Sequence, residues 1–270
     1  MKKKLIIFVK GFCVGGTMLV PGVSGGSMAM ILGIYNKLIS AVSSFMKNKK
    51  ANAILLGLFS SGAIIGMIAF AKPLLKLIEK HEMVTLYFFI GAVIGGLPMI
   101  FKKAKEGSKF NLKSCLYLIL GAILIFSFSL IPEDILNTNI SNNIGDYLLL
   151  LPIGIFAAVA LVLPGISVSY VLLLLGVYDQ TMEAISNLNI GFLAFLGIGV
   201  IIGIILTTRL LEKTMEKYPH QTYLTIVGFI IASVGEVFPG IPSINNLFLC
   251  LVMLVLGFLF ISLLSRFDEE

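Results

Sequence analysis

The sequence predicts an all-α membrane protein that crosses the bilayer several times. Of its 270 residues, 58% are hydrophobic and 13% are charged, and the mean hydropathy is +1.03, whereas a soluble domain carries about 25% charged residues. Apolar stretches of helical length follow one another, without the short polar–apolar alternation of a membrane β-barrel. One short motif also returns in the second half. We therefore expect a single membrane domain, 1–270, built from two related repeats, 1–135 and 146–270.

Ten apolar stretches mark the expected helices in chain order. They lie at roughly 5–20, 27–45, 53–71, 84–101, 114–131, 147–163, 168–186, 190–207, 222–238 and 246–264. Two neighbouring pairs are separated only by short breaks, at 21–26 and at 164–167. We expect each of these pairs to form a re-entrant helical hairpin, which dips to mid-depth and returns to its own side. The other six stretches then cross the membrane.

The two breaks share a motif. The first reads Val20-Pro21-Gly22-Val23-Ser24-Gly25-Gly26-Ser27, and the second reads Leu163-Pro164-Gly165-Ile166-Ser167-Val168-Ser169. Each copy is followed at the same distance by Gly, a β-branched residue and Tyr, so that Tyr35 and Tyr178 occupy matching positions. Pro and Gly open a helical backbone, and lipid offers the freed groups no hydrogen-bond partners. Such a pair of breaks is typical of transporters whose broken helices surround a central site.

The basic residues indicate how the chain is oriented. With the N-terminus in the cytoplasm, 16 of the 20 Lys and Arg residues fall on the cytoplasmic side, Lys72, Lys76 and Lys80 fall outside, and Lys37 lies within the first hairpin. Cytoplasmic loops are enriched in Lys and Arg, so the net charge of +6 reports membrane orientation and we expect no nucleic-acid partner. A chain that crosses at both breaks, eight times in all, would separate Lys47 from Lys2–Lys4 and follows this rule less well.

Each half then holds one hairpin and three crossings. Because three is odd, the second half is expected to be inverted relative to the first, with both termini in the cytoplasm. The halves also align beyond the breaks. Gly62-x-x-x-Gly66 matches Gly199-x-x-x-Gly203, a spacing typical of closely packed membrane helices, and Lys72 matches Arg209.

The residues at each break suit an anion. Ser24 or Ser27 is a natural N-cap for the helix after the first break, and Ser167 or Ser169 for the helix after the second. A helix N-terminus presents unpaired N–H groups and the positive end of the helix dipole. Serine hydroxyls add donors without a charge in the bilayer, and glycines let the backbone approach a ligand. We therefore expect a phosphate-like group to bind Pro21, Gly22, Ser24, Gly25, Gly26, Ser27, Pro164, Gly165, Ser167 and Ser169. The alternative is that these residues only kink and pack the helices.

Three further residues have two interpretations each. Arg209 is either an interfacial anchor whose side chain snorkels or a cation on the path of the head group, since a guanidinium binds phosphate bidentately. Tyr35 and Tyr178 are either interfacial aromatics or wall residues of the site.

The three cysteines stand singly in apolar stretches, so we expect no metal, cofactor or disulfide.

A nucleophilic serine is a competing hypothesis. The segment Gly22-Val23-Ser24-Gly25-Gly26 matches the G-x-S-x-G pattern of serine hydrolases. Such a serine needs a base within hydrogen-bond reach, and the two histidines, His81 and His220, fall in polar loops at the ends of apolar stretches. We therefore expect no enzyme activity. A transporter of small anions and a structural scaffold stay open as alternatives, and the sequence sets no oligomeric state.

The paired motif, together with Gly33-Ile34-Tyr35 and Gly176-Val177-Tyr178, closely resembles the bacterial polyprenyl-phosphate transporter family, and the likeness spans essentially the whole chain. The resemblance implies a multi-pass undecaprenyl-phosphate translocase of the bacterial cell membrane, which returns the lipid carrier of cell-envelope polymers from the outer to the inner leaflet. Its partner would be a polyprenyl-phosphate lipid, whose phosphate we expect between the two hairpin tips, neutralised by Arg209. Val168 and Tyr170 stand where the first copy has Gly25 and Ser27, so the second tip is expected to be less open.

Overall fold

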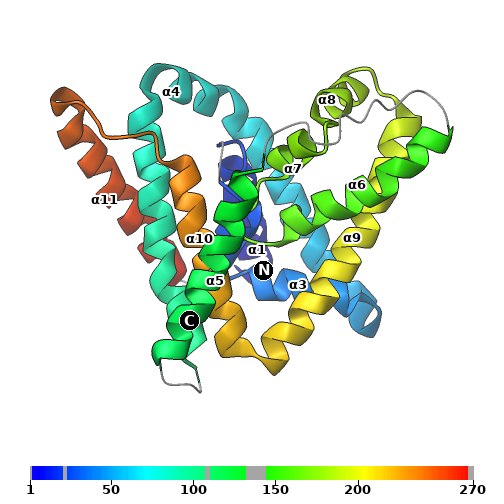
Figure 1. The fold of residues 1–270 in the computed structure, drawn as a ribbon, viewed down its shortest axis with the longest axis horizontal. Coiled ribbons are helices and arrows are strands. Elements are labelled where there is room, and N and C mark those ends of the chain that lie inside the picture. The colour runs from blue at the N-terminus through cyan, green and yellow to red at the C-terminus, as the bar shows by residue number, and fades with distance from the viewer. Residues whose placement is uncertain (1, 21–22, 107–109, 132–143, 267–270) are drawn as a thin grey trace.

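The computed structural model describes residues 2–20, 23–106, 110–131 and 144–266, and the regular structure within these ranges is entirely helical (Figure 1). The predicted all-α class is therefore confirmed. The first half contains α1 (Lys2–Thr17), α2 (Gly25–Ile31), α3 (Tyr35–Ser43), the short 3₁₀ helix η1 (Phe45–Asn48), α4 (Lys49–Lys105) and α5 (Leu112–Ser129). The second half contains α6 (Ile144–Val162), α7 (Val168–Leu174), α8 (Tyr178–Ser186), α9 (Ile190–Lys217), α10 (Pro219–Val237) and α11 (Ile244–Arg266).

Helix lengths show a membrane protein, with one difference from the expected set of crossings. Within the described ranges, five helical segments are long and apolar enough to span a bilayer: Phe45–Leu74, Lys76–Lys105, Gly145–Val162, Ile190–Lys217 and Ile244–Leu263. Four of them are expected crossings. The fifth belongs to α6, which we expected to be one arm of a hairpin. The expected crossings at 114–131 and 222–238 form α5 and α10, which are not among the five.

The polar stretch between the first two crossings is helical, whereas the sequence suggested a loop. α4, which is 57 residues long, runs through this stretch. His81 interrupts the helix with a non-helical conformation (φ −142°, ψ 47°). Lys, Glu and Leu dominate this stretch and are good helix formers, so polarity here marks an interfacial position and not a helix end. Figure 1 shows α4 arching over at one end of the molecule.

The apolar stretches 27–45 and 168–186 also differ from the prediction, because each forms two helices instead of one. Gly33 (φ 70°) and Gly176 (φ 66°) adopt the left-handed conformation. The N–H of Ile34 reaches back five residues to the carbonyl of Ala29 at 3.0 Å, and the same bond recurs after Gly176. This is a Schellman C-cap, which glycine enters without strain. The repeated Gly-x-Tyr thus ends one helix and starts the next, at Tyr35 in the first half.

Glycines let α1 and α4 pack backbone to backbone. A Cβ at Gly62 would stand 2.2 Å from the carbonyl oxygen of Phe8, and one at Gly66 would stand 2.1 Å from that of Phe12. The contact advances by four residues on both helices, so α1 and α4 run parallel and begin at the same end. The chain between them therefore returns to the end where α1 starts.

The second half repeats this arrangement between α6 and α9. A Cβ at Gly199 would lie 2.3 Å from the carbonyl oxygen of Leu151, and one at Gly203 would lie 2.8 Å from that of Ile155. These helices also run parallel. The close packing predicted from the two Gly-x-x-x-Gly pairs is confirmed in both halves.

The remaining long helices join the two halves. α4 packs against α11 and α5 packs against α10, so each pair takes one helix from each half. Gly91 of α4 and Gly228 of α10 lie at these crossings. A Cβ would stand 1.9 Å from the Leu254 carbonyl oxygen at Gly91 and 2.1 Å from that of Leu118 at Gly228. Figure 1 shows α4 and α11 at one side and α6 and α9 at the other. The larger hydrophobic core lies between them and buries α2 against α4 and α10.

Candidate functional site

The first break, which we call tip one (residues 21–27), leads into a short buried helix. Ser24 is the N-cap of α2 (φ −76°, ψ 132°), and its carbonyl accepts the N–H of Met28 at 3.1 Å. This confirms the predicted cap position, although the Ser24 side chain makes no capping hydrogen bond. Ser24 is 7% exposed and Ser27, in the first turn of α2, is 2% exposed. Pro21 and Gly22 lie outside the described residues.

The second break, tip two (residues 164–169), has the same backbone plan but a different surface. Ser167 is the predicted N-cap of α7, with nearly the same angles as Ser24 (φ −85°, ψ 128°). Pro164 and Gly165 are buried, Ser167 is half-buried and Ser169 is exposed. At the position of Ser27, tip two has Tyr170, whose hydroxyl donates to the carbonyl of Ile131 at 3.0 Å.

The two tips touch through backbone atoms. A Cβ at Gly26 would lie 3.2 Å from the nitrogen of Pro164 and 3.2 Å from the carbonyl oxygen of Val162. The buried Tyr35 donates its hydroxyl to that same Val162 oxygen at 2.7 Å. Tyr35 therefore links the two halves through a hydrogen bond. Neither of the two roles predicted for it from the sequence includes this link. Tyr178, its counterpart, is half-buried and packs against the core of the second half.

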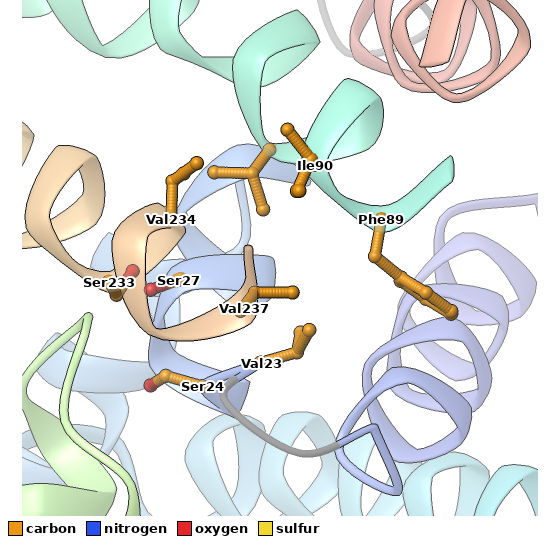
Figure 2. A pocket seen from close by; sticks show the side chains of 9 residues that line it. Val23, Ser24, Ser27, Phe89, Ile90, Ser233, Val234 and Val237 are labelled. Atoms are coloured by element: carbon orange, nitrogen blue, oxygen red, sulfur yellow. The ribbon is translucent and has the colours of Figure 1, made fainter. Parts of the chain in front are cut away.

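A small cavity lies beside tip one, and we call it the tip cavity (Figure 2). Its walls come from tip one and from facing turns of α4 and α10: Val23, Ser24, Ser27, Phe89, Ile90, Val93, Ser233, Val234 and Val237. The hydroxyl of Ser27 is buried and has no hydrogen-bond partner among the described residues. Ser233 donates to the carbonyl of Ile230 at 2.9 Å and keeps its acceptor capacity. In Figure 2 the hydroxyls of Ser27 and Ser233 point toward one another.

The tip cavity offers neutral donors at the start of a helix. Because Met28 makes the first intrahelical bond, to Ser24, the N–H groups of Gly25, Gly26 and Ser27 have no acceptor within α2. A buried, unpaired hydroxyl costs about 1–3 kcal/mol, so the unpaired Ser27 is unfavourable unless a ligand uses it. The cavity holds about 10 Å³, roughly room for one water. In this conformation it is closed to a phosphate group.

The other predicted site residues lie elsewhere. Ser167, Ser169 and Tyr178 do not line the tip cavity, and neither does Arg209. Arg209 is exposed on α9 and lines a larger groove of about 490 Å³ together with Lys47. Ser233 lines the tip cavity and was not predicted from the sequence, because a single serine in an apolar helix gives no local signal.

The structure contains a serine–histidine pair, although not at Ser24, the serine of the G-x-S-x-G pattern. His220 lies at the start of α10 and is 9% exposed, with Nε2 2.8 Å from the hydroxyl oxygen of Ser114 and Nδ1 2.5 Å from the carbonyl oxygen of Ala104. Ser114 is fully buried and also hydrogen-bonds Asn111 at the start of α5. The pair joins the ends of α4, α5 and α10. It involves Ser114 and not Ser24, and neither member lines the two cavities described above.

Comparisons with known proteins agree over most of the chain. A family described as undecaprenyl phosphate translocase-like matches residues 14–248. The chain is 32% identical to a protein of Staphylococcus aureus (strain NCTC 8325 / PS 47) named polyprenyl-phosphate transporter, over 99% of this chain and 98% of that relative. It is 26% identical to a protein of the same name from Vibrio cholerae serotype O1 (strain ATCC 39315 / El Tor Inaba N16961), over 87% of this chain and 78% of the relative. No solved structure matches the chain.

Proposed function

The chain belongs to the undecaprenyl phosphate translocase-like family, and from this premise we propose that it carries a polyprenyl phosphate from the outer to the inner leaflet of the bacterial cytoplasmic membrane. It acts as a transporter and not as an enzyme. The lipid is the carrier of cell-envelope polymers, which is thereby recycled. The polyprenyl tail stays in the bilayer while the protein handles the phosphate.

The observation that carries this proposal is the buried hydroxyl of Ser27, which has no hydrogen-bond partner among the described residues, beside the buried Ser24 at the start of α2. A phosphate ester is an acceptor of hydrogen bonds, with about −1.5 to −2 charges near neutral pH. It needs several converging donors, and this tip supplies them without a permanent charge that would be costly inside the membrane. Ser167 and Ser169 of tip two take the phosphate more weakly, since Tyr170 occupies the position of Ser27.

Transport requires the tip cavity to widen. Its walls come from both halves of the chain, because α10 faces tip one and α4, so movement of one half against the other enlarges it. In our proposal the halves 1–135 and 146–270 are inverted repeats with the termini in the cytoplasm. The hairpins then open alternately to the two leaflets. The parallel pairs α1–α4 and α6–α9 support this arrangement, because each break returns the chain to the end from which it came.

The test uses the purified full chain in vesicles that contain undecaprenyl phosphate, with a membrane-impermeant phosphatase outside. Without transport, only lipid in the outer leaflet is hydrolysed, and with the protein the inner pool becomes accessible as well. Replacing Ser24 and Ser27 together by Ala should slow this by about tenfold or more, since a hydrogen bond to a charged group contributes about 1.5–3 kcal/mol. Ser61→Ala, at an exposed serine of α4, is the matched control.

Two results would overturn the proposal. An unchanged rate in the folded double variant would remove tip one from the site. Uptake of labelled inorganic phosphate into the same vesicles, with no effect on the lipid, would instead establish a transporter of small anions.

A further inference from the structure

A second cavity of the protein, which we call the basic groove, has a different chemistry from the tip cavity. It has a volume of about 490 Å³ and shares no lining residue with the tip cavity. This volume lies within the range of small-molecule binding sites. Its walls come from the end of α3, from η1, from α4 and from α9, and two of its lining residues, Lys47 and Arg209, are basic.

Arg209 stands in this groove without a counterion. It belongs to a helix long and apolar enough to span the membrane, eight residues before the helix ends at Lys217, or about 12 Å along the axis. Its side chain has no hydrogen bond or ion pair with the described residues. Arg209 follows the apolar stretch 190–207, so it lies at the interfacial end of α9, at the level of the lipid head groups.

The nearest acid by sequence spacing is already engaged elsewhere. Glu212 follows Arg209 by three residues, yet its carboxylate accepts hydrogen bonds from Ser43 and Ser40 of α3. Glu212 also attracts Lys47 electrostatically. Two cations against one carboxylate leave a net charge of +1 at the groove. The positive charge is therefore complementary to an anion from outside the protein.

Apart from Ser43 and Ser44, the remaining lining residues of the groove are apolar. Met46 is 75% exposed, and Phe45 and Ile205 continue the apolar surface beside the two cations. Inorganic phosphate has no apolar part that could contact these walls. A polyprenyl phosphate matches both parts, because its phosphate carries up to two negative charges and its chain is a single branched hydrocarbon.

We infer that the basic groove is a second binding site for the phosphate head group of the transported lipid, separate from the tip cavity. Arg209 and Lys47 bind the phosphate, and Phe45, Met46 and Ile205 contact the first part of the chain. α1 and α4 begin at the same end, so the groove lies at the end that carries the Lys-rich N-terminal residues. This inference rests on the proposed function for the identity of the lipid, and in the proposed orientation the groove receives the lipid on the inner leaflet.

The chain contains no tryptophan, so Met46→Trp provides a single fluorescent reporter inside the groove. The variant chain, in lipid nanodiscs, is titrated with undecaprenyl phosphate, undecaprenol, phosphatidylglycerol and inorganic phosphate. We expect a saturable response to undecaprenyl phosphate, at a concentration about tenfold below that needed for the other three ligands. Arg209→Gln should weaken this binding by about tenfold, and Arg209→Lys by less, because an ammonium binds phosphate through fewer fixed donors.

Two controls separate this site from the tip cavity and from general electrostatics. Lys72→Gln changes the exposed cation of α4 at the position that matches Arg209 and should leave the titration unchanged. The Ser24→Ala, Ser27→Ala double change should slow transport by about tenfold or more, yet leave the fluorescence response intact. An equal response to phosphatidylglycerol, a response to inorganic phosphate alone, or no effect of Arg209→Gln would overturn the inference. Binding in the groove without lipid transport would keep the groove and refute the proposed function.

Discussion

The hydroxyl of Tyr35 forms a hydrogen bond between the two halves, next to the contact between the tips, and Tyr35→Phe removes it. The hydroxyl donates to the Val162 carbonyl at 2.7 Å. α6 ends at Val162, so the Val162 carbonyl has no partner from a following helical turn, and the Tyr35 hydroxyl supplies that hydrogen bond. Tyr35 is 3% exposed, which keeps water from replacing it.

The expected effect follows from this burial. A buried carbonyl that loses its partner costs about 1–3 kcal/mol, which corresponds to roughly a 5–150-fold change in the population of the conformation in which the tips touch. Tyr178→Phe is the matched control, because the Tyr178 hydroxyl has no hydrogen bond with the described residues. It should change the stability by no more than about 0.5 kcal/mol.

Two measurements check the prediction. The thermal midpoint of the purified protein should fall for Tyr35→Phe and stay constant for Tyr178→Phe. In a chain whose three cysteines are replaced, a new cysteine at Ser24 should react faster with a membrane-permeant maleimide when Tyr35 is Phe, because the closed tip cavity opens more often. Equal midpoints and equal labelling rates in the two variants would refute the role of the Tyr35 hydroxyl in linking the two halves.

Two further predictions concern single positions. Ser27→Ala should leave the thermal midpoint unchanged or slightly raised, because it removes a buried hydroxyl without a partner, while lowering lipid transport in the phosphatase assay; a fall in both would mark Ser27 as structural. Gly62→Ala should destabilise the protein by about 1–3 kcal/mol, since its Cβ would meet the Phe8 carbonyl oxygen at 2.2 Å, whereas Gly57→Ala on the same helix, with no neighbouring atom within 4 Å, should be neutral or mildly stabilising in a thermal melt.

The sequence predicts well those features that depend on neighbouring residues. Pro-Gly-x-Ser places Ser24 and Ser167 at helix N-caps, because proline, glycine and serine act on the backbone within a few bonds. The Gly-x-x-x-Gly pairs predict close helix packing for the same kind of reason, since the four-residue spacing puts both glycines on one face.

Local composition misleads where a helix boundary depends on a single residue. The apolar pattern continues across Gly33 and Gly176, so the two C-caps there were not predicted. The polar residues before His81 resemble a loop, yet they are good helix formers and α4 continues through them.

Contacts between distant segments are the part that sequence could not supply. Arg209 and Lys72 match in the alignment, but only the fold shows that Arg209 lies with Lys47 in a groove. Ser233 reaches the tip cavity because α10 packs against α4 beside tip one, and no pattern within α10 indicates it. The pairing of His220 with Ser114 likewise joins residues that are far apart in the chain.

The shared construction of the tip cavity has a genetic consequence. Ser24 and Ser27 come from α2 and its N-cap, whereas Ser233, Val234 and Val237 come from α10, so selection on transport acts on both segments at once. Suppressor substitutions that restore growth to a tip-one variant should therefore map to α10 and the facing turn of α4. Few should map to α7, although α7 is the counterpart of α2 after the second break.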